Sequence, residues 1–278
     1  MHQFIADSRY DTVICTHVFS ALILTHMLRL HPMHIRTVFI ATDYTSSPSL
    51  EVSDLQYYMI PDESLKDEFI KCGIPKERIV AAGIPVRREF WRYTDKADAK
   101  RLLGVDANHT HLLIACGSIG CGPIKNLVRQ IAKQITPDME VSVICGTNQR
   151  LYRKLKRKYA KEQLVHILGY TKQMSLYLDS ADLYLTKPGG ISVTEAAIKK
   201  LPMVFVNAVA GCEAHNMRFF MEKGAAITAA SPRELADSCI RILRSHTEQA
   251  EMVRALCAYC QSLEAAGTWD SFCKKMRS

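Results

Sequence analysis

The chain has 278 residues, enough for one large domain or two medium-sized ones, because domains usually have about 100–200 residues. Hydrophobic residues make up 48% of the sequence and charged residues 23%, which excludes wholesale disorder and fibrous repeats. The formal net charge of +8 suits an anionic partner such as a phosphate group, a nucleic acid or an acidic membrane surface, and does not choose among them.

The cysteines and the apolar stretches bear on the cellular compartment. The ten cysteines are scattered through strand-like and helix-like stretches, which favours reduced thiols in the cytosol. Cys257 and Cys260 have the spacing of metal ligands, but no second pair accompanies them, so we expect no metal site. No apolar run reaches the roughly 18 residues that a membrane-spanning helix needs. We therefore expect a cytoplasmic protein.

Short β-branched runs alternate with amphipathic segments along the whole chain, which is typical of parallel sheets covered by helices. Three or four strands fit before residue 90, at residues 12–16, 37–42, 57–60 and 78–82, with helices at 18–30 and 63–72. This is few for an independent doubly wound domain. The charged segment 91–109 is predicted to be a linker.

After this segment the sequence predicts six further strands, each followed by a helical segment. The strands fall at residues 111–116, 141–145, 164–168, 182–186, 203–206 and 225–228, and the last helices at 232–243 and 247–265. Six parallel strands make a complete Rossmann-like domain. We expect an α/β fold with a partial N-terminal domain over residues 1–95 and a complete C-terminal domain over residues 96–278.

A glycine-rich turn, CGSIGCGPI, lies between the strand that ends near Cys116 and the next helix. Gly120 and Gly122 would let the backbone approach a ligand closely, and Pro123 fits the first turn of a helix. The free amides of a helix start would suit a diphosphate. An ordinary tight connection is the alternative, and the absence of Gly-Lys-Ser/Thr argues against a P-loop.

A second turn of this kind, LTKPGGISVTE, follows the strand at residues 182–186. Lys187 adds a cation, Gly189 and Gly190 open another helix, and Glu195 lies one turn further in, where a carboxylate can accept both hydroxyls of a ribose. In a doubly wound sheet the two turns would converge on one crevice.

A third loop, NAVAGCEAHN, follows the next strand. It places Glu213, His215 and Asn216 at a helix start, where hydrogen-bonding side chains beside a diphosphate suit a sugar. Ordinary helix capping by Glu213 or Asn216 is the alternative.

These residues carry a family resemblance. KPGGISVTEA at 187–196 and AGCEAHN at 210–216 resemble the donor-site signature of the monogalactosyldiacylglycerol synthase and processive diacylglycerol glucosyltransferase family. The resemblance extends through LGYTKQM, VICGTNQ, ACGSIGCGP and GIPV to ATDY and CTHVFSA, and so covers almost the whole chain. The family consists of GT-B enzymes related to the lipid II N-acetylglucosaminyltransferase.

The resemblance implies an inverting, metal-independent hexosyltransferase with a UDP-sugar donor, a lipid acceptor such as diacylglycerol, and no further cofactor. It implies that Gly169 and Tyr170 hold the uracil edge, that Glu195 holds the ribose, and that Glu213 and Asn216 meet the sugar and phosphate. The expected donor-binding residues are Gly120, Gly122, Pro123, Gly146, Asn148, Tyr170, Lys187, Pro188, Gly189, Gly190, Glu195, Gly211, Glu213 and Asn216.

Departures from the family pattern leave two questions open. Cys212 stands where the family has Gln and His215 where it has Gly, so the donor hexose is open among glucose, galactose and N-acetylglucosamine. Family members also open with a strand and a Gly-Gly-Gly-His type loop that supplies the base on the acceptor hydroxyl, and this chain begins after that point. About 10²–10⁴-fold of rate depends on such a base. His17 and Asp43 are candidate substitutes, with capping or structural hydrogen bonding as the alternative.

The segment 150–161 carries seven cations in twelve residues on a predicted helix. It would attract an anionic membrane surface, giving a protein peripheral on the inner face of the plasma membrane, and a solvated outer helix is the alternative. Nucleic-acid binding has no supporting motif. Two other functions stay open: a catalytically impaired chain that binds UDP-sugar without transferring it, and a transferase or epimerase of the same fold that uses UDP-N-acetylglucosamine.

Overall fold

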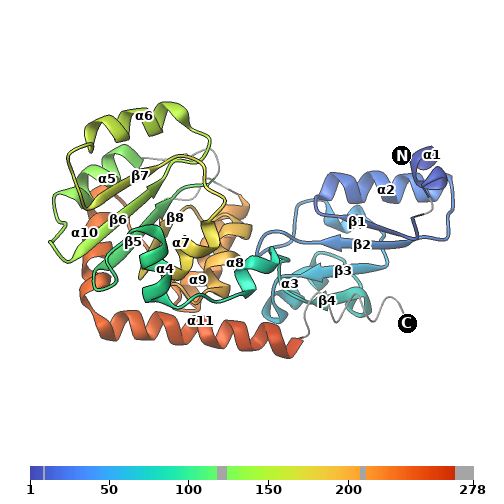
Figure 1. Ribbon diagram of the computed structural model, residues 1–278. Helices are drawn as coiled ribbons and strands as arrows, with labels where there is room; N and C mark the ends of the chain where they lie inside the picture. The colour runs from blue at the N-terminus through green and yellow to red at the C-terminus, as the bar shows by residue number, and fades with distance from the viewer. Residues whose placement is uncertain (9, 118–123, 207–210, 267–278) are drawn as a thin grey trace. The chain divides into compact units, whose positions relative to one another are not determined.

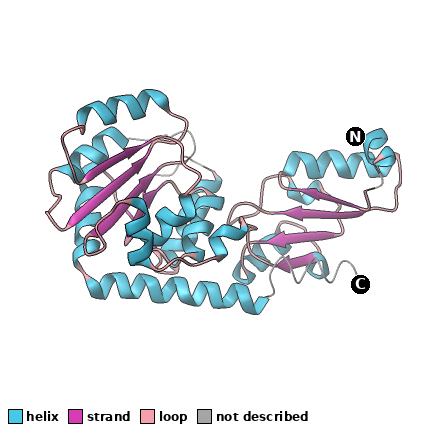
Figure 2. Ribbon diagram, in the orientation of Figure 1, coloured by secondary structure: helices cyan, strands magenta, loops and turns pink. Residues whose placement is uncertain are grey.

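A computed structural model of the chain describes residues 1–8, 10–117, 124–206 and 211–266. By packing, the chain divides into two units: residues 1–85 together with the segment from residue 261, and residues 86–260. Each unit contains one parallel sheet flanked by helices (Figures 1 and 2). The sequence-based division at residues 95 and 96 stays a prediction.

The sheet of the first unit has four parallel strands in the order β1-β2-β3-β4. Its elements are α1 (His2–Asp7), β1 (Thr12–Cys15), α2 (Val18–Leu30), β2 (Arg36–Ile40), η1 (Leu50–Val52), β3 (Tyr57–Ile60), η2 (Glu63–Leu65), α3 (Lys66–Lys71), η3 (Lys76–Arg78) and β4 (Ile79–Ala81). Leu24 of α2 and Phe69 of α3 are fully buried in one core with Phe39 and Tyr58 from the sheet. The two helices therefore cover the same face of this sheet.

The second unit has six parallel strands in the order β10-β9-β8-β5-β6-β7. Its elements are η4 (Arg88–Trp91), α4 (Lys96–Leu103), β5 (Thr110–Ala115), α5 (Ile124–Ala132), β6 (Met139–Ile144), α6 (Gln149–Lys158), β7 (Val165–Leu168), α7 (Met174–Ser180), β8 (Leu183–Thr186), α8 (Gly190–Ile198), β9 (Met203–Phe205), α9 (Cys212–Glu222), β10 (Ala226–Thr228), α10 (Pro232–Arg244) and α11 (His246–Ala266). Strand order reverses between β5 and β8, so a crevice is expected outside their carboxyl ends.

Apolar residues explain how this sheet is covered. The strands are buried on both faces, with the consecutive residues Leu112 and Leu113 of β5, and Met203 and Val204 of β9, all at 0% exposure, as near-continuous β-branched and leucine runs predict for a parallel sheet. Helices α5, α6 and α10 share one core with these strands. Parallel crossovers are right-handed, and the direction of the strand order reverses between β5 and β8, which we call the switch point. The connections on the two sides of the switch point therefore run on opposite faces of the sheet.

The segment predicted to be a linker contains a helix, α4. Asp95 caps it by accepting hydrogen bonds from the amides of Ala97 and Asp98. The ammonium groups of Lys96 and Lys100 lie 2.7 and 3.1 Å from the carboxylate of Asp182. The charged residues of this segment suggested a solvated linker, but two of them form ion pairs with Asp182. The linker prediction is therefore wrong for residues 96–103, which form a helix.

The other elements follow the prediction closely. All ten expected strands are present, and α2 covers 18–30 as predicted. The α/β expectation is confirmed. Within the described ranges, no helix combines the length and the apolar character that crossing a bilayer would require.

Candidate functional site

Two turns flank the switch point of the second sheet. The β5 turn begins at Gly117, whose φ of +73° is in the left-handed region that favours glycine. Gly120, Gly122 and Pro123, which the sequence assigns to the diphosphate, lie outside the described residues. The β8 turn is described in full, and it provides the geometry on which the site can be built.

The β8–α8 turn is tightly closed by hydrogen bonds within it. The Gly189 amide donates to the Lys187 carbonyl at 2.9 Å, and the hydroxyls of Ser192 and Thr194 donate to the carbonyls of Gly189 and Gly190 at 3.0 and 2.7 Å. A Cβ on Gly189 would lie 3.4 Å from the Ser192 hydroxyl. The first amides of α8 have no acceptor within the helix, so this end suits an anion.

Two contacts tie this turn to the start of α9. The Lys187 ammonium lies 2.7 Å from the Glu213 carboxylate, and the Asn216 amide, fully buried, donates to the Pro188 carbonyl at 2.9 Å. Helix α9 begins after Gly211, which has φ +102° and ψ −142°, a conformation essentially restricted to glycine. The structure thus brings together the residues of the second and third predicted loops.

Glu195 lies in α8 and is partly buried. The pKa of its carboxyl is raised to about 7, mainly by burial; the charge of Arg87 opposes the shift, and the charge of Glu89 adds a smaller increase. Arg87 and Glu89 form an ion pair at 2.9 Å beside η4, which packs against α8. Sequence reasoning missed this pair, although the charged residues directly after GIPV were a visible signal.

The turns after β6 and β7 lie on the same edge of the sheet. Gly146 is buried with φ +58°, and Asn148 caps α6 by accepting the Leu151 amide at 2.9 Å. Capping is therefore one role of Asn148. Tyr170 is 64% exposed, and a Cβ on the preceding Gly169 would meet no atom within 4 Å. This leaves room for a flat ligand beside the backbone of Gly169.

The two candidate bases lie in the first unit. His17, at the carboxyl end of β1, is exposed and caps α2, its Nδ1 accepting the Phe19 amide at 3.2 Å. Asp43 follows β2 and is partly buried. The structure therefore shows a capping role for His17, and a catalytic role for either residue stays a prediction.

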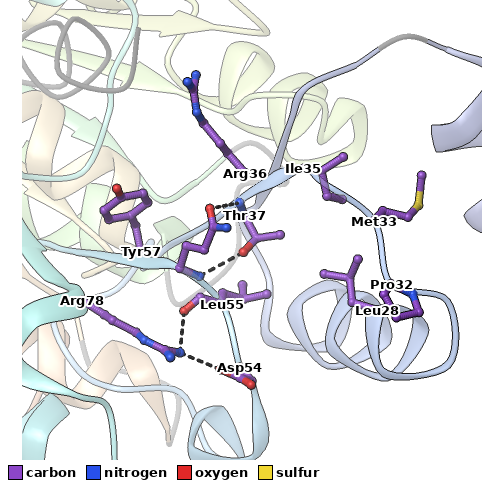
Figure 3. Close-up of a pocket in the computed structure, with 11 residues that line it drawn as sticks. Leu28, Pro32, Met33, Ile35, Arg36, Thr37, Asp54, Leu55, Tyr57 and Arg78 are labelled. Carbon is purple, nitrogen blue, oxygen red and sulfur yellow. Dashed lines mark hydrogen bonds and ion pairs between the residues drawn. The ribbon is translucent and has the colours of Figure 1, made fainter. Parts of the chain in front are cut away.

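A cavity of about 750 Å³ lies at the opposite, amino-terminal edge of the first sheet (Figure 3). Its polar groups bind one another. Arg78 donates from Nη1 to Asp54 at 2.5 Å and to the Leu55 carbonyl at 3.1 Å. Thr37 and Gln56 each accept the other's backbone amide through a side-chain oxygen. Because parallel α/β sheets bind ligands at the carboxyl ends of their strands, we place the candidate site at the β8 turn instead.

Two family models match the chain. Residues 1–86 match the model described as monogalactosyldiacylglycerol (MGDG) synthase, and residues 111–260 match the model described as glycosyltransferase family 28 C-terminal domain. The second match covers more than half of the chain and contains every described residue of the β8–α8 turn and of α9.

Curated relatives with a similar sequence include two processive diacylglycerol beta-glucosyltransferases. The protein from Staphylococcus saprophyticus is 30% identical over 247 residues, and the one from Staphylococcus epidermidis is 28% identical over 244 residues. Each match covers 88% of this chain but only 62% and 61% of the relatives. The chain therefore spans about three fifths of the length of the curated relatives it matches.

Solved structures with a similar fold include Acinetobacter baumannii MurG, with a TM-score of 0.66, 16% identity and coverage of 96% of this chain and 72% of MurG. Anabaena HepE in complex with UDP has a TM-score of 0.65, 16% identity and coverage of 99% and 80%. Staphylococcus aureus MnaA with UDP has a TM-score of 0.68, 12% identity and coverage of 91% and 72%. These similarities confirm the GT-B type of fold.

Proposed function

Because the chain belongs to glycosyltransferase family 28, we propose that it takes part in inverting transfer of a hexose from a UDP-sugar to a lipid acceptor, diacylglycerol. The similar staphylococcal proteins are named for transfer to diacylglycerol, and HepE and MnaA, which share the fold, were solved with UDP. The proposed product is a glycolipid.

One observation carries the proposal. At the switch point of a six-stranded parallel sheet, a Gly-Gly helix start is joined to the next helix by the Lys187–Glu213 ion pair and the Asn216–Pro188 hydrogen bond. A diphosphate fits the Gly-Gly start of α8, and a hydroxylated sugar fits the start of α9.

The proposal gives chemical roles to this chain's residues. In an inverting transfer the acceptor oxygen forms a bond to the anomeric carbon while the bond from that carbon to the diphosphate oxygen breaks on the opposite face. The acceptor proton passes to a base, for which His17 and Asp43 are the candidates. Charge develops on the departing UDP, and the amides at the start of α8, where the hydroxyls of Ser192 and Thr194 donate to the carbonyls of Gly189 and Gly190, would stabilise it.

The donor site is tested by calorimetric titration of the chain with UDP. Glu195→Ala removes the carboxylate assigned to the ribose and is expected to weaken UDP binding at least about tenfold, the loss expected for hydrogen bonds to a charged group. Glu222→Ala removes an exposed carboxylate at the far end of α9 and should change nothing. UDP affinity unchanged by Glu195→Ala would contradict the site assignment.

Transfer itself is tested with radiolabelled donor and vesicles that contain diacylglycerol. Running UDP-glucose, UDP-galactose and UDP-N-acetylglucosamine in parallel identifies the hexose. Binding of donor without labelled lipid would support the impaired-chain alternative. Conversion of the donor to its 2-epimer in the absence of lipid would support an epimerase and contradict the proposal.

We also propose an anionic membrane surface as a partner. Helix α6 and the residues after it carry the seven cations of 150–161, and Lys125 of α5 lies close enough to lower the pKa of Lys154, with Arg150 adding to the effect. Such a patch of like charge on α5 and α6 suits an acidic surface. Co-sedimentation with vesicles of phosphatidylglycerol, but not with phosphatidylcholine, is the expected result, and binding to neither would contradict it.

A further inference from the structure

The Lys187–Glu213 ion pair joins the loops that follow two adjacent strands. Lys187 follows β8, and Glu213 lies in the first turn of α9, which follows β9. Their charged atoms are 2.7 Å apart, and the side chains are only 22% and 24% exposed. Next to them, Asn216 is buried and bound to the Pro188 carbonyl at 2.9 Å. The pair is therefore part of a packed corner and is not a solvated surface contact.

This geometry changes the expected role of Lys187. A lysine beside a Gly-Gly helix start is expected to serve the diphosphate directly, but here its ammonium is held by Glu213. In the proposed site the Glu213 carboxylate would be repelled by the diphosphate of the donor unless a cation compensates its charge. A charge-assisted bond also fixes the direction of the carboxylate more firmly than a neutral one.

We propose that Lys187 is a positioning residue that holds Glu213 in the orientation in which it accepts hydroxyl groups of the donor hexose. Lys187 thereby sets the preference of the site for UDP-hexose relative to UDP. The inference rests on the proposed function, because it takes the corner between β8 and α9 to be the sugar end of a UDP-sugar site.

The experiment compares the affinities of UDP-glucose, UDP-galactose and UDP for the whole chain by calorimetry. The readout for each variant is the affinity for the better-bound UDP-hexose divided by that for UDP. Lys187→Met and Glu213→Gln are each expected to lower this ratio about tenfold, as loss of a charge-assisted hydrogen bond implies. Lys187→Arg keeps the cation and should retain most of the ratio. Lys133→Met, an exposed lysine directly after α5, is the matched control and should leave it unchanged.

The double variant Lys187→Met/Glu213→Gln separates positioning from direct contact with the diphosphate. If Lys187 acts through Glu213, the double variant has the same ratio as Glu213→Gln alone. Equal losses of UDP and UDP-hexose affinity in Lys187→Met, with the ratio unchanged, would overturn the inference while leaving the UDP site intact. Absence of UDP binding by the unaltered chain would instead overturn the proposed function, and the inference with it.

Discussion

We expect Glu195 to make UDP-sugar affinity depend on pH. Its carboxyl has a pKa raised to about 7, mainly by burial, with Arg87 opposing the shift and Glu89 adding to it. The proposed contact with the ribose hydroxyls needs the ionised form, because only that form accepts on both oxygens. Raising the pH should therefore strengthen binding, and lowering it should weaken binding, around neutrality.

The size of the effect follows from the ionised fraction. With a pKa of about 7, roughly one eleventh of the Glu195 carboxyl is ionised at pH 6 and ten elevenths at pH 8, so affinity should rise about tenfold between them. The same shift acts on stability. The pKa of Glu195 is higher in the folded chain than in the unfolded chain, so the folded state binds more protons. The free energy of unfolding therefore falls as the pH rises from the pKa of Glu195 in the unfolded chain through about 7.

The assay is calorimetric titration with UDP-glucose between pH 6 and pH 8. UDP-glucose is the ligand of choice because its diphosphate is esterified at both ends and does not titrate in this range, unlike that of UDP. Below pH 7 binding should also release a proton, which is seen by repeating the titration in buffers with different ionisation enthalpies.

Glu195→Gln keeps the size of the side chain but cannot titrate. We expect this variant to bind UDP-glucose weakly at every pH, with a flat profile. Tight binding by the unaltered chain with no pH dependence would refute this role of Glu195, as would a Glu195→Gln variant that keeps the roughly tenfold change.

Two further predictions concern folding. Lys199 and Asp179 form an ion pair at 2.8 Å with both side chains 1% exposed, so Lys199→Met should lower the free energy of unfolding by about 3–5 kcal/mol in denaturant titrations. Replacing both residues by apolar ones should lower the free energy of unfolding by less than Lys199→Met does. An equal loss in the double variant would contradict the prediction. Gly211→Ala places a Cβ in open space but forces a conformation that costs about 1–3 kcal/mol, and because α9 starts there UDP-glucose affinity should fall as well. Gly104→Ala, at another glycine with positive φ directly after α4, is the control: it should lower the free energy of unfolding without changing UDP-glucose affinity. A loss of UDP-glucose affinity in Gly104→Ala would show that the effect of Gly211→Ala is not specific to α9.

Much of the fold could be predicted because its signals are local. Short β-branched runs and amphipathic helices alternate with a regular spacing, and parallel strands that are buried on both faces have near-continuous apolar sequences. The prediction missed α4 although the Asp95 cap is a local signal, and Lys96 and Lys100 of this helix bind Asp182, more than 80 residues away. No local pattern reports such a partner.

The sequence by itself determined the order of strands and helices along the chain and predicts the kind of site. The glycines of the turns, the carboxylate of Glu195 and the Glu213–Asn216 loop predict contacts with a diphosphate, a ribose and a sugar because their residue types and spacing carry this chemistry locally, and the family resemblance adds the prediction of UDP. Only the tertiary structure decided which groups act together. The parallel pairing of β8 and β9 brings Lys187 to Glu213, and packing of η4 on α8 brings Arg87 and Glu89 to Glu195. Ion pairing and burial depend on distances through space, and the order of residues along the chain does not contain them.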